Sequence, residues 1–133
     1  MIELKGVAHF SIAVSDLEAS RRFYTEILGL RLVNDATAYG MLFLRAGDDY
    51  VILARCDAPL RRSTADSRRA HHAFKIAAAR YDEAKAFLAS KGVEILEEED
   101  RKNGVFVGRQ FYVHDPDDSV IEFTEWDGTS NLS

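Results

Sequence analysis

Two short stretches of the chain alternate apolar and polar residues in the same way, and each of them opens with a histidine. They are residues 9–14 and 71–76. Because successive side chains of a β-strand point to opposite faces, the bulky apolar residues of each stretch share one face, whereas His9 or His71 lies on the other. His71, and not its neighbour His72, is therefore the counterpart of His9. This pattern predicts a duplicated unit in which two strands contribute one histidine each to a shared polar site.

The first half of the chain predicts a strand, a helix and three further strands. Residues 4–14 form the first strand, and Ser15-Asp16 offers a cap for a helix that ends at Gly29. The helix has one apolar stripe, made of Leu17, Phe23, Tyr24, Ile27 and Leu28. The three strands are expected over residues 30–33, 41–44 and 50–55.

The second half repeats this order. A strand over residues 71–76 precedes a helix from about Asp82 to Gly92, and strands follow over residues 93–96, 105–113 and 119–124. The acidic run from Glu97 to Asp100 is interpreted as a solvated strand end. Two copies of one unit in a chain of this length predict a single α+β domain, residues 1–133, built from two βαβββ modules. The modules cover about residues 4–56 and 71–126, and about residues 57–70 form a linker.

Composition and charge fit an ordinary globular protein. The chain is 47% hydrophobic and 29% charged, which is the ordinary balance of a globular domain. Its formal net charge of -5 argues against binding to nucleic acid. No apolar run has the length of about 20 residues that spans a bilayer, and the N-terminus shows no secretory signal. With Cys56 as its only cysteine, the chain is predicted to be cytoplasmic and without a membrane partner.

Four arginines concentrate in the predicted linker, which has neither a helical nor a strand period. They are Arg61, Arg62, Arg68 and Arg69. Two interpretations stay open for them. Either the linker is simply solvated, or one or more of the guanidinium groups closes over an anionic substrate, because a guanidinium pairs bidentately with carboxylate or phosphate.

A carboxylate interrupts the last strand of the second module. Glu122 stands in an otherwise apolar run, and a buried carboxylate without a partner is costly. A metal shared with His9 and His71 would neutralise it and leave room for water or substrate. The alternative is an ion pair between Glu122 and a linker arginine. When the ends of the two modules are aligned by eye, Leu53 of the first corresponds to Glu122 of the second.

These residues give the chain a resemblance to the vicinal oxygen chelate superfamily, which includes glyoxalase I, bleomycin-resistance proteins, fosfomycin-resistance enzymes, methylmalonyl-CoA epimerase and extradiol dioxygenases. The resemblance spans nearly all of residues 5–125 and rests on four runs, residues 9–14, 23–30, 71–76 and 111–122. It implies two βαβββ modules whose curved mixed sheets enclose a metal-binding cleft. It also implies that His9, His71 and Glu122 bind a divalent metal ion (Fe, Mn, Zn or Ni). The family further implies a homodimer in which the two histidines can come from different subunits.

Two further site residues follow from the resemblance and from strand alternation. Tyr112 matches an active-site tyrosine of the extradiol dioxygenases and the fosfomycin-resistance enzymes. Tyr112 could equally be a packed aromatic residue without a catalytic role. With the ordinary tyrosine pKa of about 10, it needs a nearby metal or cation to act as a catalytic acid. Ser11 shares a strand face with His9 and is expected to touch substrate. His72 and His114 are expected to be structural or surface residues.

Departures from the family pattern narrow the function. Glyoxalase I and the epimerase have a fourth ligand where this chain has Leu53, which argues against both. Fosfomycin-resistance enzymes carry an arginine shortly after the glutamate, where this chain has Asn131. Extradiol enzymes use an additional catalytic histidine that has no convincing equivalent here.

Three hypotheses for the function result. With Fe(II), two histidines and one carboxylate leave positions for dioxygen, so extradiol-type ring cleavage of a small oxygen-rich molecule is the leading hypothesis. The first alternative is addition of a thiol or water to an epoxide, as in fosfomycin resistance. The second is metal-free ligand binding, as in bleomycin resistance.

Overall fold

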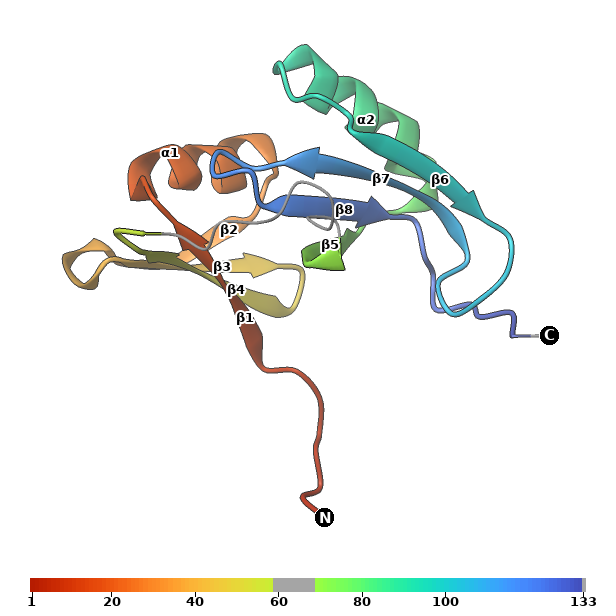
Figure 1. Ribbon diagram of the computed structural model, residues 1–133, viewed down its shortest axis with the longest axis horizontal. Helices are drawn as coiled ribbons and strands as arrows, with labels where there is room; N and C mark the ends of the chain where they lie inside the picture. Colours follow the sequence, from red (N-terminus) through yellow and green to blue (C-terminus); the bar gives the residue numbers. More distant parts are fainter. Residues whose placement is uncertain (59–68, 133) are drawn as a thin grey trace. The chain divides into compact units, whose positions relative to one another are not determined.

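The computed structural model describes residues 1–58 and 69–132. The chain divides into two compact units, Met1–Arg61 and Arg62–Ser133, and each contains one four-stranded mixed sheet with a helix against it (Figure 1). The strand order is β1-β4-β3-β2 in the first sheet and β5-β8-β7-β6 in the second. The predicted α+β fold with two βαβββ modules is therefore confirmed. The predicted linker residues Arg61, Arg62 and Arg68 lie outside the described residues.

The first module has four strands, one helix and two short helical segments. They are β1 (His9–Val14), α1 (Leu17–Arg21), the π-helical segment η1 (Arg22–Ile27), β2 (Arg31–Ala36), the 3-10 turn η2 (Thr37–Tyr39), β3 (Met41–Ala46) and β4 (Asp49–Arg55). The side chain of Asp16 caps α1 by accepting a hydrogen bond of 3.0 Å from the backbone N–H of Ala19. Gly29 follows the helical segments with a φ of 84°, a backbone conformation that favours glycine. The predicted start and end of this helix are confirmed.

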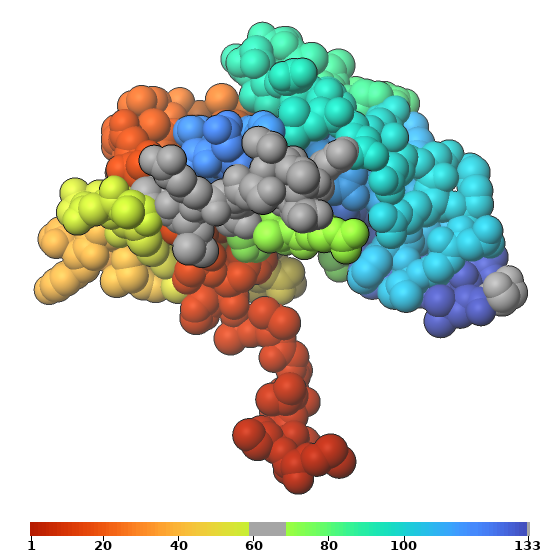
Figure 2. Space-filling view, viewed as in Figure 1, coloured from red at the N-terminus to blue at the C-terminus, as the bar shows by residue number. Residues whose placement is uncertain are grey.

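The first strand is shorter than predicted. It begins at His9 and not at residue 4, because its parallel partner β4 begins at Asp49 and its ladder starts with the pair His9–Tyr50. Residues 1–8 therefore lie beyond the end of the strand with which they would have to pair. All of them are exposed, and the N-terminal segment projects away from the first sheet (Figure 2).

The second module has four strands, a helix and one short helical turn. They are β5 (His71–Lys75), the 3-10 turn η4 (Ala78–Arg80), α2 (Tyr81–Ser90), β6 (Glu97–Arg101), β7 (Gly108–His114) and β8 (Val120–Thr124). β5 is parallel to β8, and the other neighbours are antiparallel. The predicted strand over residues 93–96 is wrong, because the acidic run that follows it forms β6 itself.

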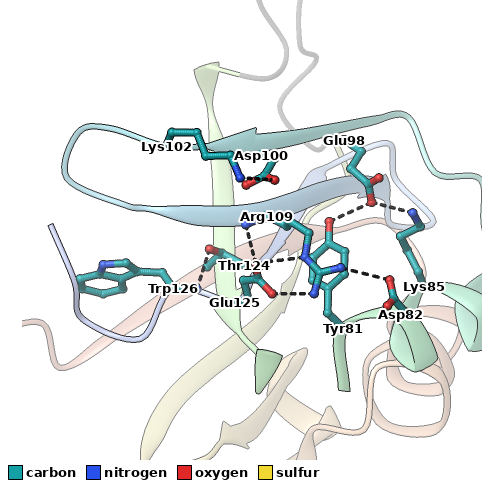
Figure 3. A network of polar contacts seen from close by, with 10 residues as sticks. All are labelled: Tyr81, Asp82, Lys85, Glu98, Asp100, Lys102, Arg109, Thr124, Glu125 and Trp126. Atoms are coloured by element: carbon teal, nitrogen blue, oxygen red, sulfur yellow. Dashed lines mark hydrogen bonds and ion pairs between the residues drawn. The ribbon is translucent and has the colours of Figure 1, made fainter. Parts of the chain in front are cut away.

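The acidic strand β6 is stable because its carboxylates meet cations on both faces. Strand alternation separates Glu98 and Asp100 from Glu99. Glu98 accepts a hydrogen bond of 2.6 Å from Lys85 of α2, and Asp100 accepts one of 2.8 Å from Lys102 (Figure 3). On the other face Glu99 pairs with Arg101 at 3.1 Å. These ion pairs offset the mutual repulsion of the acidic side chains.

One face of the second sheet is closed by α2. The Tyr81 ring packs edge-on against Phe111 with 5.4 Å between ring centroids, and its hydroxyl donates a hydrogen bond of 2.9 Å to Glu98. Arg109 lies over the Tyr81 ring and binds both carboxylate oxygens of Glu125, at 3.0 and 2.8 Å (Figure 3). Because this face is filled by packing and ion pairs, only the opposite face of the sheet can carry an open site. No helix within residues 1–58 and 69–132 is long and apolar enough to cross a membrane.

The strand pairings correct the alignment of the two modules. In both modules the last strand lies parallel to the first, so equivalent residues can be identified from their ladder partners. Glu122 pairs with Ala73, which stands two residues after the histidine that opens β5. The same position in β1 is Ser11, and its partner in β4 is Ile52. Ile52 is therefore the structural counterpart of Glu122.

The predicted correspondence between Leu53 and Glu122 is thus wrong by one residue. Leu53 is fully buried and pairs with Ile12 and Leu42, which are buried as well, so its side chain belongs to the core of the first module. The inference drawn from it survives the correction, because isoleucine, like leucine, cannot ligate a metal.

Candidate metal and substrate site

The open face of the second sheet carries a pocket of about 480 Å³. Its walls come from all four strands and from the segments that follow β6 and β8. The lining residues are His71, Ala73, Lys75, Arg101, Phe106, Gln110, Tyr112, Glu122, Thr124 and Trp126. His71 lines the pocket whereas His72 does not, as strand alternation predicts.

Two of the predicted metal ligands meet in this pocket. Nε2 of His71 lies 3.5 Å from Oε1 of Glu122, on adjacent strands. With ligand bonds of about 2.1 Å and a tetrahedral angle, two donor atoms of one metal ion stand about 3.4 Å apart. The Glu122 side chain is only 11% exposed, so a bound cation would offset the cost of burying its charge. An imidazole nitrogen and a carboxylate oxygen at this spacing fit a divalent metal ion.

The third predicted ligand, His9, belongs to the first module. It opens β1 and is exposed, as is Ser11 on the same strand face. Within residues 1–58 and 69–132 of one chain, no three side chains of His, Cys, Asp or Glu form a group that could hold a metal ion. A ligand set of three therefore remains a prediction.

Tyr112 lies beside the two candidate ligands. Its ring stands edge-on to the imidazole of His71, with 5.9 Å between centroids, and it pairs with Glu122 across β7 and β8. Burial and, after it, hydrogen bonding to the negatively charged Glu122 raise the pKa of the Tyr112 phenol. The hydroxyl therefore keeps its proton at neutral pH and donates a hydrogen bond to the Glu122 carboxylate.

A polar chain that sequence reasoning missed holds Tyr112 in place. Nε2 of Gln110, which is buried, donates to the Tyr112 hydroxyl at 3.4 Å and to Glu99 at 2.9 Å. Glu99 is in turn bound by Arg101. The signal was present in the sequence, because Gln110 and Tyr112 are two residues apart and must share one face of β7.

Comparisons with known proteins identify the family of the chain. Residues 6–123 match the family model described as the Glyoxalase/Bleomycin resistance protein/Dioxygenase superfamily. The chain is 32% identical over 119 residues to a glutathione transferase FosA from Serratia marcescens, an alignment that covers 90% of this chain and 79% of that protein.

Two solved structures have the same fold. An integron cassette protein from the metagenome of the Halifax Harbour sewage outfall is 25% identical, with a TM-score of 0.73 and coverage of 91% of this chain and 98% of the other. A variant of the fosfomycin resistance protein FosX from Listeria monocytogenes, crystallised with Mn(II) and a dihydroxypropylphosphonic acid, is 21% identical, with a TM-score of 0.74 and coverage of 93% and 92%. By its sequence match and its fold, the chain belongs to the Glyoxalase/Bleomycin resistance protein/Dioxygenase superfamily.

Proposed function

We propose that this protein is a metal-dependent enzyme that opens the epoxide ring of a small anionic molecule by adding a thiol or water. The observation that carries the proposal is the convergence of His71, Glu122 and Tyr112 in one pocket of a chain 32% identical to a glutathione transferase FosA. A vicinal diol, such as the one bound to the Listeria relative, is what water addition to an epoxide produces. Both relatives favour this reaction over the ring-cleaving dioxygenase that the sequence suggested first.

The ligands would be His71 and Glu122 of one chain and His9, which we assign to a second copy of the chain. When bound there, the metal would supply positive charge to the oxygens of the substrate. The Tyr112 hydroxyl would turn from Glu122 and donate its hydrogen bond to the oxygen that leaves the epoxide carbon. As the new C–S or C–O bond forms, the ring C–O bond breaks, its electron pair stays on the oxygen, and the proton of the nucleophile ends there.

Turnover of fosfomycin itself tests this proposal. The purified protein is incubated with Mn(II) and fosfomycin, with glutathione or with water alone, and the phosphonate products are followed by phosphorus NMR. We expect one of the two adducts, and we expect Tyr112→Phe to lower kcat about 100-fold or more with little change in KM. Tyr39→Phe is the matched control, because Tyr39 is 83% exposed in the first module. Oxygen consumption with a catechol and Fe(II), without reaction of the epoxide, would contradict the proposal in favour of the dioxygenase.

The sharing of the site between two chains has a separate test. His9→Ala and His71→Ala are each expected to lose metal affinity, because each removes a ligand. If the site uses His9 of one chain and His71 of the other, a mixed dimer of the two variants has one intact site. A fully exchanged equal mixture should then recover about a quarter of the metal sites of the parent protein. Recovery of none after proven subunit exchange would place all three ligands in one chain.

A further inference from the structure

The end of the pocket away from Glu122 is lined by aromatic rings and a cation. Phe106 and Trp126 stand edge to face, with 4.9 Å between ring centroids, and Nζ of Lys75 lies over the Trp126 ring at 5.9 Å from its centroid. All three residues line the same pocket as His71 and Glu122. Phe106 is 47% exposed, which leaves part of its ring open to a ligand.

Two chain segments hold this aromatic pair in position. The indole N–H of Trp126 donates to the backbone carbonyl of Thr129 at 2.8 Å, and its backbone N–H donates to the Thr124 hydroxyl at 3.1 Å. Next to Phe106, a backbone bridge joins Gly104 to Asn131. The one polar atom of the indole, its N–H, is therefore satisfied inside the protein, and the ring contributes apolar surface to the pocket.

Arg101 and Lys75 differ in whether their charge is paired with an acidic side chain. Arg101 also lines the pocket, but its guanidinium is bound to Glu99 at 3.1 Å. Lys75 forms no ion pair with an acidic side chain among the described residues 1–58 and 69–132. A cation beside two aromatic rings suits a ligand that combines a flat apolar ring with a negatively charged group.

The distance between the two ends sets the size of the ligand. His71 and Lys75 lie on the same face of β5 and four residues apart, which corresponds to about 13 Å of strand. Glu122 pairs with Ala73, between the two, and a three-carbon phosphonate held at His71 is shorter than this stretch of strand. A substrate that uses the whole pocket must be longer.

We infer that Lys75, Phe106 and Trp126 form a subsite for an aromatic ring that carries an anionic group, in a substrate whose reacting oxygens lie at the His71–Glu122 end. This inference rests on the proposed function for the role of that other end. It narrows the substrate class to aryl-substituted anions and gives Lys75 the role of a specificity residue.

Trp126 is the only tryptophan of the chain, so its fluorescence reports directly on this subsite. The full chain is titrated in EDTA, where no metal can bind the anionic group, with three probes: phenylphosphonate, propylphosphonate and benzyl alcohol. We expect phenylphosphonate to bind about tenfold more tightly than either of the others, because it alone offers both a ring and a charge. Equal affinity for phenylphosphonate and propylphosphonate would overturn the aromatic subsite.

The variants separate the charge from the ring. Lys75→Met should weaken phenylphosphonate about tenfold and leave benzyl alcohol unchanged, whereas Phe106→Leu should reduce the preference for phenylphosphonate over propylphosphonate. Lys91→Met is the matched control, because Lys91 lies 5.6 Å over the Phe87 ring in a lysine–aromatic pair that does not line the pocket. Equal losses in Lys75→Met and Lys91→Met would refute the assignment. Since no turnover or metal is involved, failure of the epoxide reaction would leave these results standing.

Discussion

The one-residue correction that makes Ile52 the counterpart of Glu122 can be tested by stability. Ile52 and Leu53 are neighbours with similar side chains, but they face opposite sides of the first sheet. The pair Ile52→Glu and Leu53→Glu therefore introduces the same carboxylate on the open face and in the core. If the alignment made by eye were right, Leu53→Glu would be the variant on the open face and Ile52→Glu the one in the core.

The structure sets the expected magnitudes. Leu53 is fully buried, and truncation of a buried leucine to alanine alone costs about 2–5 kcal/mol. A carboxylate at that position also loses its hydration, so Leu53→Glu should lose more than about 4 kcal/mol, much of the usual stability of about 5–15 kcal/mol. Ile52 is only half-buried, and Ile52→Glu should cost no more than about 1 kcal/mol.

Urea unfolding followed by circular dichroism measures both variants, with Ile52→Ala and Leu53→Ala as controls for lost packing. Metal titration of Ile52→Glu adds a second measurement, because a carboxylate equivalent to Glu122 should tighten metal binding. Similar unfolding midpoints for the two glutamate variants, or a folded Leu53→Glu that binds metal more tightly, would refute the register argument and restore the original alignment.

Three further predictions concern the ion pairs and the assembly. Hydrogen bonds from Arg109 hold the pKa of Glu125 below its ordinary value of 4.5. The ionised carboxylate therefore stabilises the fold fully above about pH 4.5, and this contribution is lost as the pH falls through the lower pKa of the folded state. Glu125→Gln should therefore cost about 1 kcal/mol at pH 7 and clearly less at pH 3 in urea unfolding. Tyr81→Phe removes the hydrogen bond to Glu98 and should lower stability by about 1 kcal/mol in the same assay. Equilibrium sedimentation at micromolar concentration should show a dimer, and a monomer would count against a site shared between chains.

The sequence predicted the elements whose own residues show a strand or helix period. It failed for β6, whose stability depends on residues outside the run. Strand alternation was enough to place His71 on the open face, and an acidic residue in an apolar run was enough to single out Glu122. The strand β6 was missed because four consecutive acidic residues look like a solvated strand end until their partners are known. Those partners come from α2, from β6 itself and from Lys102, which follows β6.

The slip at Leu53 has a local cause in the turns. The hairpin between β3 and β4 closes from Ala46 to Asp49, whereas the one between β7 and β8 runs from His114 to Val120. Both turns contain two consecutive aspartates, and superposing those pairs hides the difference in turn length. In the longer turn Asp118 has a left-handed φ of 62°. In the shorter turn the residue with a left-handed φ is Gly47. Turn chemistry, rather than hydrophobic pattern, decided the register.

The duplicated fold has kept its two modules alike in the core and made them different on the open faces. Leu53 and its counterpart Phe123 are both buried, so both serve packing. One position earlier the modules diverge, with Ile52 in one and Glu122 in the other. A carboxylate at both positions would place two negative charges on one site if the modules share it, and would fill a position that a substrate oxygen needs. Isoleucine at one of them leaves that position open, as the proposed site for a metal and a substrate requires.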